Sequence, residues 1–321
     1  MLQIDPKNTP IPVVHQYLLG GVAPRPIALV STLSADGVRN LTPFSFFSAF
    51  GANPPTIAFS PARRGRDGTL KDTYNNLLAT KECSVQAVTH SMLHQINLAS
   101  AECAPDVDEF VLSGLTPIAS VVVKPARVKE SPFQMECILK QMIPLGEGKA
   151  SGNLAICEVV MMHIAEDILD GTIVNPARID HVARNGGNWW SRVTGANAFK
   201  LAKPENNNLI GYDGLPEFVR RSMVLSANNL AQLANWPAIP SLDDAKSLAG
   251  DEAHLEISRV TFERFERLGD YSSMMVMAKA AVRTGMKNFY LFEQTAKTAL
   301  DHADAREFAW KTLILGNAIT K

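Results

Sequence analysis

Short apolar runs separated by turn residues dominate the first 165 positions of the chain. The runs are rich in β-branched and aromatic residues, which is typical of strands. Ala35-Asp36-Gly37 is a hairpin turn signal, and Pro54-Pro55 interrupts the pattern before another run. The pattern predicts strands at 27–32, 39–47, 56–60, 83–88, 121–128, 133–142 and 154–163. Apolar residues at helical spacing predict helices at 71–80 and 92–101.

The links between these strands indicate how the strands pair. Most links have hairpin length, whereas parallel strands need crossovers of a dozen or more residues. The expected fold is therefore mainly β, of the α+β class. We expect an antiparallel barrel with a few covering helices.

A second pattern begins after a Gly- and Asn-rich stretch at 185–214. Beyond Pro216, apolar residues recur at three- to four-residue spacing, and acids and bases mix on the polar positions. This predicts an all-helical C-terminal extension of four or five helices, with no ligand motif in it. We place the boundary between a first domain at 1–205 and a second at 206–321, and expect the second to be structural.

Composition excludes several classes of function. The 31 Lys and Arg residues nearly balance the 32 Asp and Glu residues, so a nucleic-acid partner is not expected. The chain starts without a secretory signal pattern, and no apolar run approaches the roughly 20 residues that span a bilayer. The four cysteines at 83, 103, 137 and 157 are widely spaced, as in free thiols of the cytoplasm. We therefore expect a cytoplasmic protein without a membrane partner.

A basic, glycine-punctuated loop at 61–73 is the first candidate for chemistry. Three arginines and Lys71 precede the predicted helix, and Thr69, Asp72 and Thr73 can cap it. A helix start offers free N–H groups and a partial positive charge, so nearby cations would complete a phosphate site. The alternative is a solvated basic loop with an ordinary helix cap.

The segment 39–48 is the second candidate, because small hydroxyl residues alternate there with aromatic ones. Such a segment can border a flat polar ring with backbone amides and enclose it with aromatics. The alternative is a core strand with every second side chain turned inward. Ser31 and Thr32 likewise end their strand with two hydroxyls.

A metal site is not expected. His90 and His94 stand one helical turn apart, but no third ligand of comparable clarity lies near them in the sequence.

Several boxes in order give the first 200 residues a family likeness. These are RPIALVST (25–32), NLTPFSFFSAFGANPPTIAFSP (40–61), KDTYNN (71–76), SAECAPDVDEF (100–110) and RNGGNWW (184–190). This part of the chain resembles the flavin reductase-like family with the FMN-binding split barrel. The glycine-rich box of such proteins usually ends in tyrosine, and Trp190 stands there instead.

The resemblance implies a split barrel, a homodimer and bound FMN. By motif, Ser31 and Thr32 would border the flavin ring, and Asn40, Thr42, Ser45, Phe46 and Phe47 would follow its edge. Around the phosphate, the resemblance implies Ser60, Arg66, Lys71, Asp72 and Thr73. This agrees with the independent interpretation of the basic loop.

Three functional hypotheses stay open at this point. The first is an NAD(P)H-dependent FMN reductase that supplies an oxygenase or another electron acceptor. The second is an electron carrier with tightly bound FMN and no nicotinamide site. The third is a non-catalytic barrel protein that has lost the flavin.

Overall fold

The computed structural model describes residues 1–201, 203–204, 209–248 and 258–321. The chain divides into two compact units, Met1–Lys200 and Leu201–Lys321. The predicted boundary between residues 205 and 206 lies outside the described residues.

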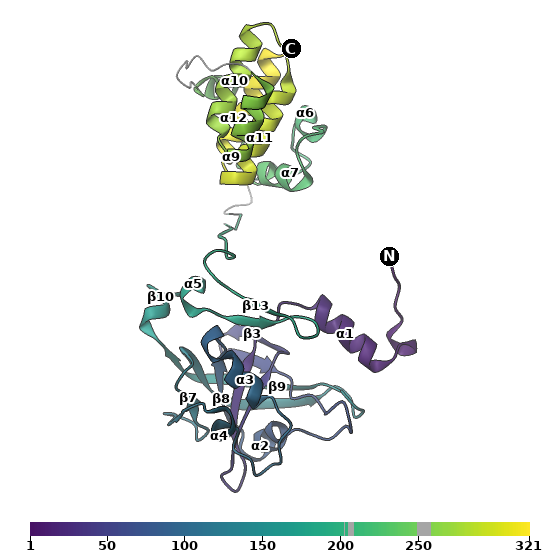
Figure 1. Cartoon of the computed structure of the whole chain (residues 1–321), viewed down its shortest axis with the longest axis vertical. Helices are drawn as coiled ribbons and strands as arrows, with labels where there is room; N and C mark the ends of the chain where they lie inside the picture. Colours follow the sequence, from purple (N-terminus) through teal and green to yellow (C-terminus); the bar gives the residue numbers. More distant parts are fainter. Residues whose placement is uncertain (202, 205–208, 249–257) are drawn as a thin grey trace. The chain divides into compact units, whose positions relative to one another are not determined.

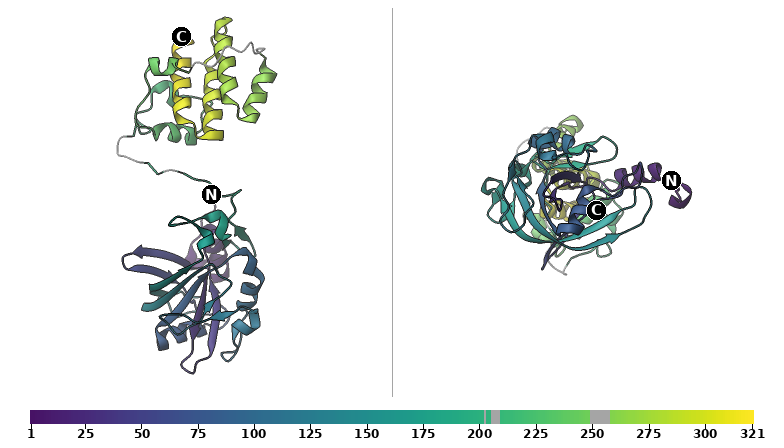
Figure 2. Two further views of the ribbon diagram at one scale, coloured as in Figure 1. Left: turned by 90° about the vertical axis from the view of Figure 1, so that its left-hand side faces the viewer. Right: turned by 90° about the horizontal axis from the view of Figure 1, so that it is seen from below.

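A seven-stranded antiparallel sheet forms the frame of the first unit (Figure 1). Its strands are β1 (Ala28–Leu33), β2 (Arg39–Phe44), β3 (Phe47–Ala52), β4 (Pro55–Phe59), β5 (Glu82–Ala87), β8 (Phe133–Pro144) and β9 (Asn153–Ile164). The spatial order is β2-β1-β5-β8-β9-β4-β3, so β2 and β3 are edges and the sheet does not close. The strands curl around a common interior, as the end-on view in Figure 2 shows. The predicted antiparallel split barrel is confirmed.

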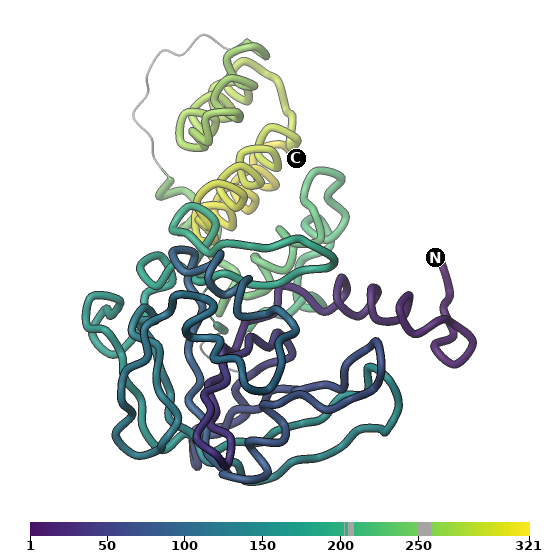
Figure 3. Tube along the Cα trace, turned by 60° about the horizontal axis from the view of Figure 1, so that its bottom comes forward, coloured from purple at the N-terminus to yellow at the C-terminus, as the bar shows by residue number. Residues whose placement is uncertain are grey.

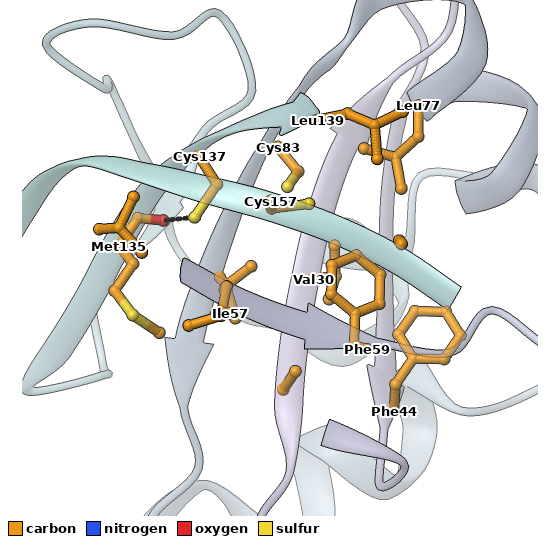
Figure 4. Close-up of a cluster of buried hydrophobic side chains, with 14 residues drawn as sticks. Val30, Phe44, Ile57, Phe59, Leu77, Cys83, Met135, Cys137, Leu139 and Cys157 are labelled. Atoms are coloured by element: carbon orange, nitrogen blue, oxygen red, sulfur yellow. Dashed lines mark hydrogen bonds between the residues drawn. The ribbon is translucent and has the colours of Figure 1, made fainter. Parts of the chain in front are cut away.

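Two hydrophobic clusters pack against the curved sheet. The first fills the barrel interior with alternate side chains of the strands, including Val30, Phe59 and the thiols Cys83, Cys137 and Cys157 (Figure 4). The second lies between the sheet and the covering helices. β1 and β2 thus have two apolar faces, because Val30 and Phe44 pack in the first cluster and Leu29 and Leu41 in the second.

Short helices cover the sheet. They are α2 (Asp72–Thr80), α3 (Leu93–Ala99), α4 (Glu109–Ser113) and α5 (Pro176–Ile179), with 3-10 turns at Pro6–Asn8, His90–Met92 and Glu166–Ile168. The predicted covering helices are confirmed; α2 packs against β1, and α3 and α4 pack against β2. Small pairs complete the unit: β6 (Pro117–Ile118) with β7 (Arg127–Val128), β10 (Leu169–Asp170) with β11 (Ile173–Val174), and β12 (Val182–Arg184) with β13 (Trp190–Arg192).

The predicted strand at 121–128 is wrong over most of its length. Only Arg127–Val128 is a strand there. The N–H groups of Val121, Val122 and Val123 donate to the buried Glu136 carboxylate, at 2.8, 2.6 and 3.0 Å respectively. A side chain from a neighbouring strand therefore takes the place of a ladder partner.

A helix that the sequence analysis did not predict, α1 (Ile11–Gly21), stands near the N-terminus and projects from the barrel (Figure 3). None of its residues is buried, and it begins at Pro10 without a side-chain cap. The apolar side chains of α1 are therefore not packed into a hydrophobic core within the described part of this unit.

The second unit is helical. Its helices are α6 (Glu217–Arg220), α7 (Ala227–Ala234), α8 (Leu242–Lys246), α9 (Arg259–Leu268), α10 (Tyr271–Arg283), α11 (Phe289–Ala303) and α12 (Arg306–Ile319). Leu233, Leu300, Trp310 and Leu313 lie at the centre of its core. The predicted all-helical extension is confirmed, but the predicted number of four or five helices is wrong, because the described residues of this unit form seven. Within the described residues, no helix is long and apolar enough to cross a bilayer.

Candidate functional site

A network of buried polar side chains joins β1 and β2 to the start of α2. Thr32 and Asn40 are paired in the β1–β2 register, and the Thr32 hydroxyl donates to Asn40 Oδ1 at 3.2 Å. The hydroxyl of Thr73, in the first turn of α2, donates to the same oxygen at 2.7 Å. Asn76 Nδ2 donates to the Thr32 hydroxyl oxygen at 3.1 Å. All four side chains are buried, so the network fixes the start of α2 against the sheet.

Glu109, the first residue of α4, extends this network across the outer edge of β2. Its carboxylate accepts hydrogen bonds from the Leu41 N–H and from Asn40 Nδ2, each at 3.0 Å. Burial raises the pKa of Glu109 and the nearby Asp72 charge raises it further, while these hydrogen bonds act in the opposite direction. Because β2 is an edge strand, its outward N–H groups need a partner, and Glu109 supplies one.

Strand alternation separates Ser31 from this network. Successive side chains of a strand point to opposite faces. Thr32 therefore shares a face with Val30, which packs in the barrel interior, whereas Ser31 shares a face with Leu29, which packs beneath α3 and α4. The Ser31 hydroxyl is buried and has no hydrogen-bond partner in the described ranges. The structure thus brings Thr32, and not Ser31, to Asn40.

Other predicted ring residues lie where the chain passes from β2 to β3. The predicted strand 39–47 is interrupted at Ser45, which is half-buried and lines a cavity. The Thr42 hydroxyl accepts a long hydrogen bond of 3.4 Å from Asn40 Nδ2. Phe47 turns its ring toward the barrel interior cluster. These side chains therefore face different directions.

Phe46 instead meets a buried arginine that anchors α1. Arg25 lies 5.8 Å from the centre of the Phe46 ring. Its guanidinium donates to the carbonyls of Leu19 and Val22 at the end of α1, and to the Asn185 carbonyl at 3.1 Å. Arg25 thus joins α1, Phe46 and the glycine-rich box, a role that the sequence analysis missed.

The basic loop folds around Arg64. The Arg64 guanidinium donates to the Thr69 hydroxyl at 3.3 Å, to the Leu70 carbonyl, and to the Asp72 carboxylate at 3.2 Å. Its side chain is only 17% exposed. Arg64 therefore shapes the loop and places a positive charge at the start of α2. The sequence analysis included it only as one cation of the loop.

The β8–β9 hairpin tip supports this loop from the side, and the two segments run side by side in Figure 3. The Arg63 N–H donates to the Ser151 carbonyl at 2.9 Å. Ser60, at the end of β4, accepts a 3.3 Å hydrogen bond from the Asn153 N–H. Ser60 thus holds the base of the loop.

Lys71 stands at the start of α2 without a direct ion pair among the described residues. It occupies the N-cap position with no side-chain cap bond, and its ammonium group forms no hydrogen bond or ion pair within the described part of the chain. Burial lowers the pKa of Lys71 and the positive charge of Arg64 lowers it further, while the negative charges of Glu102 and Asp72 act in the opposite direction. The first N–H groups of α2 also lack intrahelical acceptors. Together these groups form an electropositive site that a ligand anion would complete.

Arg66 lies farther out than the other predicted phosphate residues. Its side chain is 75% exposed, and it pairs with Asp67 at 3.3 Å and with Glu102 at 3.6 Å. It borders a cavity of about 390 Å³ together with Arg64, Thr69, Asp72 and residues 102–105.

A second cavity, of about 600 Å³, is lined in part by Ser100, which lies two residues before the segment 102–105 that borders the first cavity. It is lined by Ser45, by three polar residues of the α3 region, His94, Asn97 and Ser100, and by Arg184, Asn188 and Trp190 of the glycine-rich box. The Arg184 guanidinium lies 4.5 Å from the centre of the Trp190 ring. The segment 100–105 therefore borders a charged cavity at one end and a cavity with polar and aromatic walls at the other.

His94 lines this cavity. The described residues contain no group of three or more His, Cys, Asp and Glu side chains that could hold a metal ion.

The open antiparallel barrel, with a cationic helix start beside it, defines a protein of the split-barrel class. Residues 20–178 match the flavin reductase like domain. An uncharacterized protein of Aquifex aeolicus (strain VF5) is 35% identical over 196 residues, which cover 61% of this chain and 97% of that protein.

Solved structures agree with this assignment. The nitrilotriacetate monooxygenase component B of Bacillus cereus is 33% identical with a TM-score of 0.59, over 63% of this chain and 98% of its own. A protein with a split barrel domain from Shewanella frigidimarina NCIMB 400 shares the fold at 21% identity with a TM-score of 0.53, over 63% of this chain and 98% of its own. The chain belongs to the flavin reductase-like family.

Proposed function

We propose that this protein binds FMN and reduces it with NAD(P)H. The observation that carries the proposal is Lys71, a partly buried ammonium at the uncapped start of α2 that makes no direct ion pair among the described residues. A buried cation is costly unless an anion compensates it. The phosphate of FMN is such an anion, and membership of the flavin reductase-like family supports a flavin as its carrier.

The residues present fit FMN at both ends. Lys71 and the N–H groups of Asp72 and Thr73 would hold the phosphate, with Arg64 and Arg66 beside them. The cavity lined by Ser45, Asn97 and Trp190 has room for a flat polar ring. The other residues that the resemblance implies around the ring, Thr32, Thr42, Phe46 and Phe47, lie nearby in the chain but do not line this cavity. Ser60 would hold the base of the basic loop through its hydrogen bond with the Asn153 N–H, whereas the Ser31 hydroxyl is buried and has no partner among the described residues.

FMN, when bound, supplies the redox chemistry by accepting hydride from a nicotinamide and passing electrons on. The protein contributes binding and orientation, and it excludes water from the ring. Arg184, which lines the cavity, would be a donor that stabilises negative charge on a reduced ring.

Anaerobic mixing of the FMN-loaded protein with NADH and with NADPH tests this function. We expect the flavin absorbance near the visible maximum to bleach with at least one of them. Tightly held FMN that neither nucleotide bleaches would identify an electron carrier instead. A protein that takes up no FMN would be a barrel protein without flavin chemistry.

We also propose a homodimer. The edge strand β3 exposes Phe50 at 67% of its surface, and β9 exposes Met161 and Met162. A largely apolar cavity of about 610 Å³ is lined in part by Phe47 and Ser48 of β3 and by Val159 and Met162 of β9, and large exposed apolar areas mark interfaces. Sedimentation equilibrium of the whole chain should give twice the chain mass of 34.9 kDa.

The electron acceptor is proposed by analogy. The Bacillus cereus structure is named as a component of a monooxygenase, so we propose an oxygenase as the consumer of the reduced flavin. We place the activity in the cytoplasm, where NAD(P)H is supplied. Co-expression with a candidate oxygenase and measurement of coupled substrate oxidation would test this partner.

A further inference from the structure

The side-chain amide of Asn40 has no hydrogen-bonding group left for a ligand. Its Nδ2 atom donates to Glu109 Oε1 at 3.0 Å and to the Thr42 hydroxyl oxygen at 3.4 Å. Its Oδ1 atom accepts from the hydroxyls of Thr32 and Thr73. Both amide hydrogens and both lone pairs are therefore used within the protein.

Glu109 fixes the direction of these hydrogen bonds. An ionised carboxylate only accepts hydrogen bonds, so the NH₂ group of Asn40 must face Glu109 and its oxygen must face Thr73. The Thr73 hydroxyl then gives its proton to Asn40 at 2.7 Å. A phosphate oxygen carries no proton at neutral pH to offer the hydroxyl, so Thr73 is left with its backbone N–H for that ligand.

We propose that Glu109 is a positioning residue for the phosphate end of the FMN site. It acts through Asn40, which holds the Thr73 side chain inward and so fixes the first turn of α2, where the free N–H groups and Lys71 lie. The inference rests on the proposed FMN binding and extends it to a residue on α4.

A simpler role for Glu109 would be to satisfy the Leu41 N–H on the edge of β2. The substitution Glu109→Gln separates the two roles. Its amide oxygen can still accept from Leu41, but its NH₂ group then faces the NH₂ group of Asn40. Two donors repel, so the Asn40 amide must turn over, and its NH₂ group then faces the Thr73 hydroxyl.

The test compares FMN with riboflavin, which has the same ring but no phosphate. Dissociation constants are measured by flavin fluorescence quenching on the full chain. In Glu109→Gln we expect FMN to bind about tenfold more weakly, the usual cost of a disturbed hydrogen bond to a charged group. Riboflavin affinity should stay within about twofold of the unsubstituted chain, the usual error for independent sites.

Glu130→Gln is the matched control. The Glu130 carboxylate also accepts a backbone N–H, that of Thr116, with both oxygens at 3.1 Å. It makes no contact with the Asn40 network. We expect this variant to leave the affinities of both flavins unchanged.

If Glu109→Gln folds poorly, two variants of Thr73 test the hydrogen-bonded connection from Glu109 through Asn40 to Thr73. Thr73→Val keeps the shape of the buried side chain and removes the hydroxyl, and should weaken FMN about fivefold without affecting riboflavin. Thr73→Ser keeps the hydroxyl and should retain FMN affinity.

The ratio of the two affinities decides the outcome. Selective loss of FMN in Glu109→Gln and Thr73→Val supports the positioning role. Equal loss of both flavins, or no loss of either, overturns it. If the unsubstituted chain binds neither flavin, the proposed function itself fails, and that result is evident before any variant is compared.

Discussion

Replacing Lys71 with methionine isolates the contribution of its charge. Methionine keeps most of the unbranched side chain and removes the ammonium group, so packing changes little. In the unsubstituted protein this ammonium has already lost much of its water, since burial lowers its pKa. A bound phosphate would therefore interact with Lys71 at a lower desolvation cost than with a fully exposed lysine.

The expected loss of FMN affinity in Lys71→Met can be worked out from the contacts around Lys71. A hydrogen bond to a charged partner contributes about 1.5–3 kcal/mol. Arg64 is held by Thr69, Leu70 and Asp72, so it is not free to replace Lys71. We expect Lys71→Met to weaken FMN binding by about 2 kcal/mol, which is about 30-fold in affinity.

Lys71→Met should also leave two other quantities undiminished, the affinity for riboflavin and the free energy of unfolding. Riboflavin affinity should be unaffected, because no phosphate is present. The free energy of unfolding should not decrease, since the lowered pKa of Lys71 means that the folded state disfavours the charge that methionine removes.

Isothermal titration of FMN and riboflavin, with Lys124→Met as the control, measures these quantities. Lys124 is exposed and lies outside both cavities of the site. An unchanged ratio of FMN to riboflavin affinity in Lys71→Met would refute the phosphate site. In the unsubstituted protein, FMN affinity should also fall as the pH rises through the lowered pKa of Lys71, and this fall should be absent from the methionine variant.

The remaining predictions concern the scaffold. Burial would raise the pKa of Glu136, but hydrogen bonds from Val121–Val123 and His163 outweigh burial and lower it to about 2. Because the pKa of Glu136 is higher in the unfolded chain, the ionised carboxylate contributes about 3 kcal/mol to the free energy of unfolding. This contribution is present above about pH 4.5 and is lost as the pH falls toward 2. Urea unfolding from pH 2 to 6 should show this slope, and Glu136→Gln should remove it. In Gly316→Ala the new Cβ would lie 2.4 Å from Phe292 Cγ, so we expect about 1–3 kcal/mol of destabilisation by thermal unfolding, with no change in FMN affinity. Deleting everything after Gly214 should lower stability or alter the oligomer while FMN affinity stays within a small factor; loss of flavin binding would show that the helices take part in the site.

The division of the chain into a barrel and helices could be predicted from local pattern. The strands β1, β4, β5, β8 and β9 lie where short apolar runs between turn residues predicted them. This works because the rise and alternation of a strand depend on neighbouring residues in the chain. The start of α2 was also predicted closely, because the helical pattern begins directly after the Gly-rich loop.

Contacts between distant residues were beyond such reasoning. Val121 to Val123 have a strand-like composition, yet their N–H groups bind Glu136 because that carboxylate is buried next to them. The helix α1 was missed because its apolar side chains are exposed and its end is held by Arg25, outside the helix.

The sequence determined which chemical groups surround the site: a run of cations before a helix, hydroxyl residues on two strands and a glycine-rich box. The tertiary structure decided what each group does. It turned Arg64 inward to the loop and left Arg66 exposed, placed Ser31 and Thr32 on opposite faces of one strand, and brought Glu109 to Asn40 across 68 intervening residues. A side chain's role depends on where its polar atoms point after folding, and only the packed chain fixes that direction.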